Sequence, residues 1–263
     1  MKTYNELKLA QELIRFPTVK TEDKGIIKFL SKKLSSIGFK CIVIKSKGTG
    51  IKPALNLYAK FGNSKPHINF LGHTDVVANL SNWKIPPFKG VIRKGYLNGR
   101  GSQDMKGGIA CFISAISNFI KNEKFQGSIS IIIAADEETT GLGTPAIIKY
   151  LKRRAEKIDF SIIAEPSSNK SIGDEIRIGR RGSMNGIITV NGKSGHSAFY
   201  GSYINPCTAL AKIITKLKST SLDTGTKFMP QSNLEFTKIN VENLSENVVP
   251  QSVSAKFNVR FNS

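Results

Sequence analysis

Short apolar segments alternate with helical patterns between residues 4 and 164, and this alternation restricts the fold more than any other feature. Expected helices, with apolar residues at helical spacing, lie at 4–16, 24–37, 107–121 and near 144–154. Expected strands lie at 41–44, 55–61, 67–72, 128–135 and 159–164. The last two strands and the helix at 107–121 are apolar enough to be buried, while 76–100 is expected to be an irregular loop. Such alternation is typical of a largely parallel α/β sheet.

The polarity pattern changes near Ile178. Beyond it, polar and apolar residues alternate in strand-like segments, and one helical pattern interrupts them at 205–218. The expected strands lie at 187–193, 234–241 and 253–261. This pattern predicts a smaller α+β unit whose sheet has one exposed face. We therefore expect two domains, 1–178 and 179–263.

Acidic side chains gather where three of the expected strands end, and another acid precedes the helix at 107–121. Six of the 19 acids lie in these four places, so the concentration is not that of scattered surface charge. The carboxyl ends of parallel strands share one edge of a sheet, where ligands bind. The residues expected at this edge are His73, Asp75, Asp104, Asp136, Glu137, Glu138 and Glu165.

A cluster of carboxylates repels itself unless it shares protons or cations. A divalent metal is the simplest solution, and carboxylate and imidazole ligands without thiolates suit zinc, cobalt or manganese. A single strand-end acid or a lone histidine is usually structural, so the metal hypothesis rests on the whole set. Of the adjacent Glu137 and Glu138, one would bind metal and the other would take a proton from water.

The chain resembles the zinc aminoacylase/carboxypeptidase family of co-catalytic metallohydrolases in four motifs, GHTDVV at 72–77, GRGSQDMKGG at 99–108, ADEET at 135–139 and AEP at 164–166. The resemblance implies a catalytic domain with a mostly parallel, mixed sheet flanked by helices, and a smaller α+β domain that acts as lid and dimerisation domain. Three further segments are most similar to members that remove succinate from N-succinyl-LL-2,6-diaminopimelate in lysine biosynthesis. They are NWKIPPF at 82–88, IGRRGS at 178–183 and SGHSAF at 194–199.

The same resemblance implies a role for individual residues of the catalytic domain. Two Zn²⁺ ions per subunit, with Co²⁺ as an alternative, would be bound by His73, Asp104, Glu138 and Glu165, with Asp104 bridging them. Glu137 would be the general base. Asp75 would orient the imidazole of His73.

In the small domain, the resemblance implies that His196 reaches the partner subunit's site in a homodimer and stabilises the oxyanion. Arg180, Asn247 and Arg260 would hold the carboxylates of a small dicarboxylate substrate. Phe199 stands where these enzymes usually have a tyrosine, which puts one substrate hydrogen bond in question.

The family takes a last metal ligand from a histidine near its C-terminus, and the chain has only three histidines. His67 precedes His73 by six strand residues, or roughly 20 Å, so it cannot be that ligand. His196 already lies in the lid. We therefore expect a C-terminally truncated member with a weakened metal site and little or no activity. A related activity, such as acetylornithine deacetylation or dipeptide cleavage, and an inactive remnant serving as an interaction module remain alternatives.

Several other classes of protein can be set aside on the net charge, the length of the apolar runs and the positions of the cysteines. The net charge of +20 is compatible with nucleic-acid binding, but the lysines are scattered and no binding motif accompanies them. Glu6 and Glu12 interrupt any signal peptide, and the longest apolar run is too short to span a membrane. We expect a cytoplasmic protein without nucleic-acid or membrane partners. The distant cysteines, Cys41, Cys111 and Cys207, are expected to be buried, reduced thiols.

Overall fold

The computed structural model describes residues 2–47, 53–78, 81, 83–242 and 245–262. The chain divides into two compact units, unit 1 over Met1–Ser168 and unit 2 over Asn169–Ser263, and each is described by itself. This division falls earlier than the boundary expected after residue 178. Asn82, which opens the NWKIPPF segment, lies outside the described residues.

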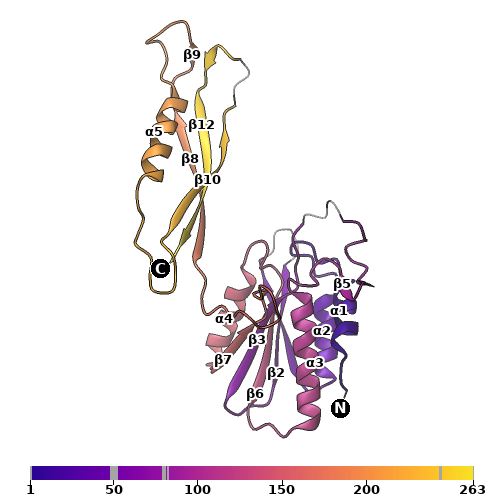
Figure 1. The fold of residues 1–263 in the computed structure, drawn as a ribbon. Coiled ribbons are helices and arrows are strands. Elements are labelled where there is room, and N and C mark those ends of the chain that lie inside the picture. The colour runs from indigo at the N-terminus through magenta and orange to yellow at the C-terminus, as the bar shows by residue number, and fades with distance from the viewer. Residues whose placement is uncertain (1, 48–52, 79–80, 82, 243–244, 263) are drawn as a thin grey trace. The chain divides into compact units, whose positions relative to one another are not determined.

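Unit 1 is built on a five-stranded mixed sheet (Figure 1) with the strand order β1-β2-β6-β3-β7. Its strands are β1 (Lys40–Ser46), β2 (Ala54–Phe61), β3 (His67–His73), β6 (Ser128–Ala134) and β7 (Phe160–Ile163). Strand β3 runs parallel to both β6 and β7, whereas β2 pairs antiparallel with β1 and β6. The mixed α/β sheet is confirmed, although its parallel part is confined to β6, β3 and β7.

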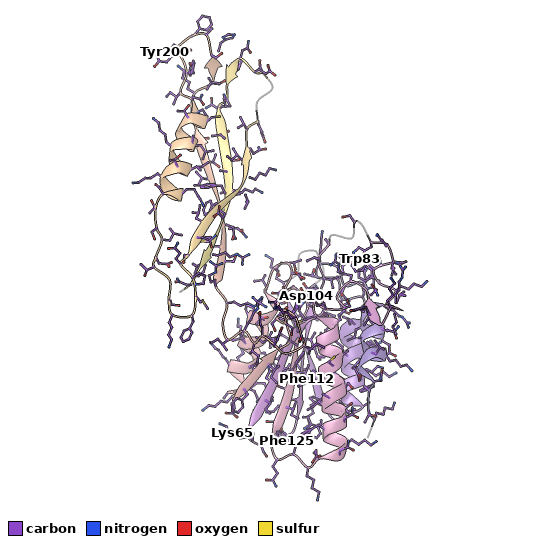
Figure 2. All side chains as sticks on the ribbon, viewed as in Figure 1. Lys65, Trp83, Asp104, Phe112, Phe125 and Tyr200 are labelled. Carbon is purple, nitrogen blue, oxygen red and sulfur yellow. The ribbon has the colours of Figure 1, made fainter. Side chains whose placement is uncertain are left out.

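Helices cover both faces of this sheet because its strands are apolar on both sides. The helices are α1 (Glu6–Ile14), α2 (Ile26–Ser35), α3 (Lys106–Asn122) and α4 (Gly143–Arg153). On β6, Ile131 packs in a cluster with residues of α1, α2 and α3, while its neighbour Ile132 packs against Ile147 and Leu151 of α4. This opposition follows from the two-residue repeat of a strand. Phe112 of α3 (Figure 2) stacks on Phe70 of β3 with ring centroids 4.4 Å apart.

Three expectations of burial were wrong, for strand β7, for helix α3 and for the cysteines. Strand β7 is apolar but lies at the sheet edge, so Phe160, Ile162 and Ile163 are exposed in the described chain. Helix α3 contacts the sheet with one side only, and its outer side exposes Cys111 and Phe119. All three cysteines are unpaired thiols, as expected, but none of them is fully buried.

The expected irregular loop contains a hairpin that was not anticipated. Strands β4 (Val91–Arg93) and β5 (Tyr96–Asn98) pair antiparallel. The two residues between them, Lys94 and Gly95, have φ angles of 52° and 79°. Positive φ at both positions is the conformation of the type I′ turn, one of the two commonest two-residue hairpin turns.

Unit 2 is a small α+β unit in which an antiparallel sheet, of order β10-β12-β8, is covered on one face by a helix. Its elements are β8 (Gly182–Asn191), β9 (Gly195–His196), α5 (Pro206–Lys218), β10 (Asn233–Asn240), β11 (Val248–Val249) and β12 (Ser252–Phe261). Leu210 of α5 packs on Val253 and Ala255, while Ile187 and Ile239 remain exposed. The small β9–β11 ladder joins residues 195–196 to 248–249. None of the described helices is long and apolar enough to cross a membrane.

Two isoleucines provide a test of this core. Ile131 and Ile162 both lie opposite Phe70, on strands either side of β3, but their exposed fractions are 0% and 52%. Ile131→Ala should lower the free energy of unfolding by ~2–5 kcal/mol, because it leaves a cavity in the core. Ile162→Ala should lower it by less than about 1 kcal/mol. Urea denaturation of the 263-residue chain measures both, and equal losses would contradict the burial of Ile131 in the core and the exposure of Ile162 at the sheet edge.

Candidate metal centre

The candidate site lies at the carboxyl ends of the parallel strands. Lys65 and Phe125 precede β3 and β6, and Figure 2 places Asp104 at the opposite end of unit 1. His73 is the last residue of β3 and lies opposite Ala134, the last residue of β6. The ADEET segment therefore begins directly beside His73.

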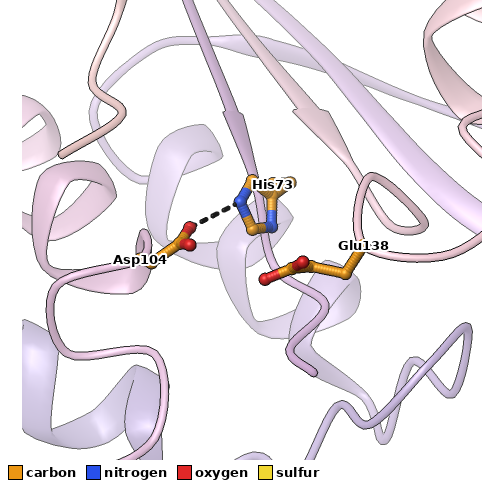
Figure 3. Close-up of side chains that lie close together, drawn as sticks. All are labelled: His73, Asp104 and Glu138. Atoms are coloured by element: carbon orange, nitrogen blue, oxygen red, sulfur yellow. Dashed lines mark hydrogen bonds and ion pairs between the residues drawn. The ribbon is translucent and has the colours of Figure 1, made fainter. Parts of the chain in front are cut away.

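The imidazole of His73 is buried, and its surroundings determine which of its two nitrogens carries the proton. Its Nδ1 atom lies 3.0 Å from the main-chain oxygen of Asp75, which can only accept a hydrogen bond. The proton is therefore on Nδ1 when the ring is neutral, and the Nε2 lone pair faces the acids. Nε2 lies 2.9 Å from Asp104 Oδ1 (Figure 3). It also lies 3.7 Å from Glu165 Oε1.

Two overlapping groups of potential ligand atoms meet at this imidazole. In each group, one atom per residue lies within 4.8 Å of the others. The first consists of His73, Asp104 and Glu138, drawn in Figure 3, and the second of His73, Glu137 and Glu165. The structure thus gathers side chains from three strand ends and from the loop before α3, as the sequence predicted.

Asp75 holds the backbone of both neighbouring glutamates. Its buried carboxylate accepts the main-chain N–H of Glu137 at Oδ1, at 3.1 Å, and that of Glu138 at Oδ2, at 2.9 Å. The same Oδ1 lies 3.4 Å from His73 Nδ1, farther than the main-chain oxygen of Asp75. The side chain of Asp75 therefore positions the ADEET turn, and its main chain provides the closer acceptor for His73.

Asp136 was grouped with the metal-binding acids by sequence, but its side chain serves another purpose. It accepts hydrogen bonds from the hydroxyl of Thr140 and from the main-chain N–H groups of Leu142 and Gly143, at 3.0 and 2.8 Å. These groups lie at the start of α4. A Cβ at Gly143 would lie 2.5 Å from Asp136 Oδ1 and 2.3 Å from Asn56 Oδ1, so a side chain there would displace these two groups. Asp136 anchors the far side of the turn that carries Glu137 and Glu138.

Two supporting residues were not anticipated. The hydroxyl of Thr18 donates to the main-chain oxygen of Thr74 at 2.5 Å, and the main-chain oxygen of Thr18 accepts the N–H of Val76 at 3.0 Å. Lys106, which is fully buried, donates to the main-chain oxygen of Phe16 at 2.7 Å. Burial lowers the pKa of Lys106 to about 7, against the opposing effect of the Asp75 charge. The only sequence signal was the lysine within the GRGSQDMKGG loop.

The electrostatics of the site favour a cation. Burial disfavours the charged imidazole, but Asp75 and the neighbouring carboxylates outweigh burial and raise the pKa of His73 to about 9. Burial and the charge of Asp104 also raise the pKa of Glu138. These acids hold an extra proton on the imidazole, and a divalent cation would supply that positive charge instead. The imidazole and carboxylate donors fit a metal such as zinc.

The predicted residues of unit 2 form two separate groups. Arg180 and Arg260 line an open pocket of about 530 Å³, together with Arg177 and Arg181. His196 and Asn247 lie together at the β9–β11 ladder, where His196 Nε2 is 3.1 Å from Asn247 Nδ2.

Two further residues considered in the sequence are also placed. Phe199 is exposed, and its ring centroid lies 5.6 Å from that of His196. His67 lies at the opposite end of β3 from His73, where its Nε2 atom is 2.8 Å from Ser130 Oγ. This position agrees with its exclusion as a ligand.

Removing the Asp75 carboxylate should destabilise unit 1. Asp75→Ala leaves two main-chain N–H groups without their acceptor, at ~1–3 kcal/mol for each group that stays unsatisfied. Asp174→Ala is the matched control, because Asp174 also accepts main-chain N–H groups but lies on an exposed loop where water can replace it. Urea denaturation should show a clear loss for the first variant and little change for the second. Equal midpoints for Asp75→Ala and the parent chain would contradict this role.

Comparison with known proteins identifies relatives over the whole chain. The model of peptidase family M20/M25/M40 matches residues 70–260. A protein of Pelagibacter ubique named succinyl-diaminopimelate desuccinylase is 46% identical over 267 residues, covering 100% of this chain and 70% of the relative. One of the same name from Ehrlichia chaffeensis is 44% identical over 259 residues, covering 97% of this chain and 68% of the relative. The chain thus spans about 70% of the length of these relatives.

The fold has a counterpart among solved structures. An M20 family metallo-carboxypeptidase from Sulfolobus solfataricus superimposes with a TM-score of 0.79 at 20% sequence identity. The match covers 99% of this chain and 71% of that one. This likeness establishes the arrangement of strands and helices common to the two proteins.

Proposed function

This chain belongs to peptidase family M20/M25/M40, and on that premise we propose that it serves a metal-dependent amide hydrolysis. The proposed substrate is N-succinyl-LL-2,6-diaminopimelate, which would yield succinate and LL-diaminopimelate in lysine and diaminopimelate biosynthesis. The name of relatives at 41–46% identity supports this choice. The observation that carries the proposal is the convergence of four acids, Asp104, Glu137, Glu138 and Glu165, on the imidazole of His73.

The proposed cofactor is Zn²⁺, two ions per subunit, with Co²⁺ as an alternative. His73, Asp104 and Glu165 would hold one ion, and Asp104 and Glu138 the other. Bound there, a divalent metal polarises a carbonyl and lowers the pKa of water. The Nδ1–H bond of His73 to the main chain of Asp75 supports this assignment, because it leaves Nε2 free to act as the ligand.

Glu137 is the proposed general base. Its side chain is exposed, while its backbone is held by Asp75, so the carboxylate can meet water from a fixed position. It would accept a proton from the attacking water and then deliver it to the nitrogen of the leaving amine. His196 would donate a hydrogen bond to the oxyanion of the tetrahedral intermediate.

The arginine pocket of unit 2 is the proposed site for substrate carboxylates. Arg180 and Arg260 both line it, and guanidinium groups pair with carboxylates through two parallel hydrogen bonds. Arg181 is partly committed to Asn233, with Nη1 2.8 Å from Oδ1. Asn247 would contribute an amide to the same substrate. In this proposal unit 1 is catalytic, unit 2 is a lid and forms a homodimer, and the protein acts in the cytoplasm.

Substitution of the proposed base should separate turnover from metal binding. Glu137→Gln keeps the shape of the side chain but removes its basicity, so turnover should fall at least ~100-fold while bound zinc is unchanged. Succinate release and metal content per chain measure the two quantities. Glu138→Gln is the comparison, because it should lose bound metal. Unchanged turnover in Glu137→Gln would show that another residue is the base.

The acyl preference follows from the same assays. Release of succinate from the succinyl substrate, with little release of acetate from acetylornithine, supports the proposal. The opposite preference would favour a related deacylase, and zinc binding without hydrolysis of either substrate would favour an inactive remnant.

The pocket can be tested by binding alone. Arg260→Lys keeps the positive charge but loses the two-pronged donor, so succinate should bind at least about tenfold more weakly. Arg154→Lys is the control, because Arg154 lies over the Tyr150 ring in unit 1, outside the pocket. Titration calorimetry with the 263-residue chain measures both. Equal affinities in the two variants would remove Arg260 from the substrate site.

A further inference from the structure

Two predicted substrate-contacting side chains, His196 and Asn247, are bonded to each other. His196 lies on β9 and is paired across the ladder with Val248 of β11, directly after Asn247. The main-chain N–H of Ser197 also donates to the main-chain oxygen of Asn247 at 2.9 Å. The backbone therefore fixes both residues, and His196 Nε2 lies 3.1 Å from the amide of Asn247.

The main chain determines which imidazole nitrogen carries the proton. The N–H of Ala198 points at His196 Nδ1, at 3.1 Å, and a main-chain N–H can only donate. Nδ1 must therefore have a free lone pair. A neutral imidazole carries one proton, so this proton lies on Nε2.

That proton determines how the amide of Asn247 is turned. The nitrogen Nδ2 of Asn247 is placed nearest His196 Nε2, but two donors cannot bond each other. If Nε2 instead accepted a hydrogen bond from Nδ2, the imidazole would carry no proton on either nitrogen. A half-turn of the amide exchanges oxygen and nitrogen with almost no change in shape. After the turn, Oδ1 accepts from His196 Nε2–H. Nδ2 takes the position that Oδ1 held before, 2.6 Å from Ser245 Oγ, and donates to that hydroxyl.

We propose that Asn247 is a positioning residue for His196, whose imidazole it holds through the amide oxygen as the Nε2–H tautomer. The consequence for catalysis rests on the proposed function. In that reaction, the Nε2–H group is the donor that meets the oxyanion. Asn247 holds this donor in place until an oxygen of the substrate replaces the amide oxygen.

The tautomer can be observed directly by long-range ¹H–¹⁵N NMR correlation of the imidazole rings in the 263-residue chain. There are only three histidines, and His196→Gln identifies the signals of His196 by their loss. The expected pattern is an unprotonated Nδ1 and a protonated Nε2, without averaging between tautomers. A protonated Nδ1 or an averaged pattern would overturn the proposal.

Variants of Asn247 test the acceptor. Asn247→Leu preserves the approximate size but removes the oxygen, so exchange of the Nε2 proton with water should accelerate about fivefold, the factor that corresponds to one net hydrogen bond. Asn247→Asp retains an acceptor and should restore slow exchange. Asn258→Leu is the control, because Asn258 bonds Ser183 and Asn185 elsewhere in unit 2.

Each outcome of these exchange measurements is decisive. Equal exchange in Asn247→Leu and the parent chain would overturn the role of Asn247. The main-chain amide spectrum verifies that each variant folds. Because no turnover is measured, the tautomer result stands apart from the proposed function, which fails only if the metal-loaded protein does not hydrolyse its substrate.

Discussion

The candidate site depends on the hydrogen bonds that the carboxylate of Asp75 accepts. A buried carboxylate is costly unless its oxygens receive hydrogen bonds, and here they accept two main-chain N–H groups from the turn that follows the neighbouring strand β6. Those N–H groups belong to the two glutamates with different proposed roles. Since the same carboxylate fixes the backbone of both residues, Glu137 and Glu138 differ in the surroundings of their side chains. The side chain of Glu137 is exposed and that of Glu138 is half-buried.

The sheet brings this carboxylate to its partners. Strands β3 and β6 are parallel neighbours that end at the same level, so residues following each strand meet without a long connection. Asp136 fixes the other side of the turn at the start of α4. The segment 135–143 is thus held by one carboxylate from its own sequence, Asp136, and by that of Asp75, which lies two residues after the end of β3. This explains why successive acids in a row point in different directions.

The sequence was sufficient for much of this arrangement. Apolar runs predicted all five strands of the mixed sheet of unit 1, though not the β4–β5 hairpin. The acids at three strand ends predicted their convergence, because both follow from local pattern and from sheet geometry. The position of a strand within the sheet could not be predicted from the sequence, since β7 has the apolar composition of a buried strand but lies at an edge. The side of α3 that faces water could not be predicted either, because it depends on what packs against the helix. The separate role of Asp136 was also hidden, because its partners Leu142 and Gly143 reveal their function only through their backbone N–H groups.

The contacts of Thr18 and Lys106 have a consequence for how the site assembles. They connect the segment after α1 with the carboxyl end of β3 and the start of α3, so groups from three distant parts of the chain must meet before the ligands are in place. Contacts between residues far apart in sequence form slowly and cooperatively during folding. No short peptide excised around HTD or ADEET would reproduce the centre. Metal affinity should therefore report the folding of the whole of unit 1, and a chelator should lower its thermal stability as a single cooperative transition.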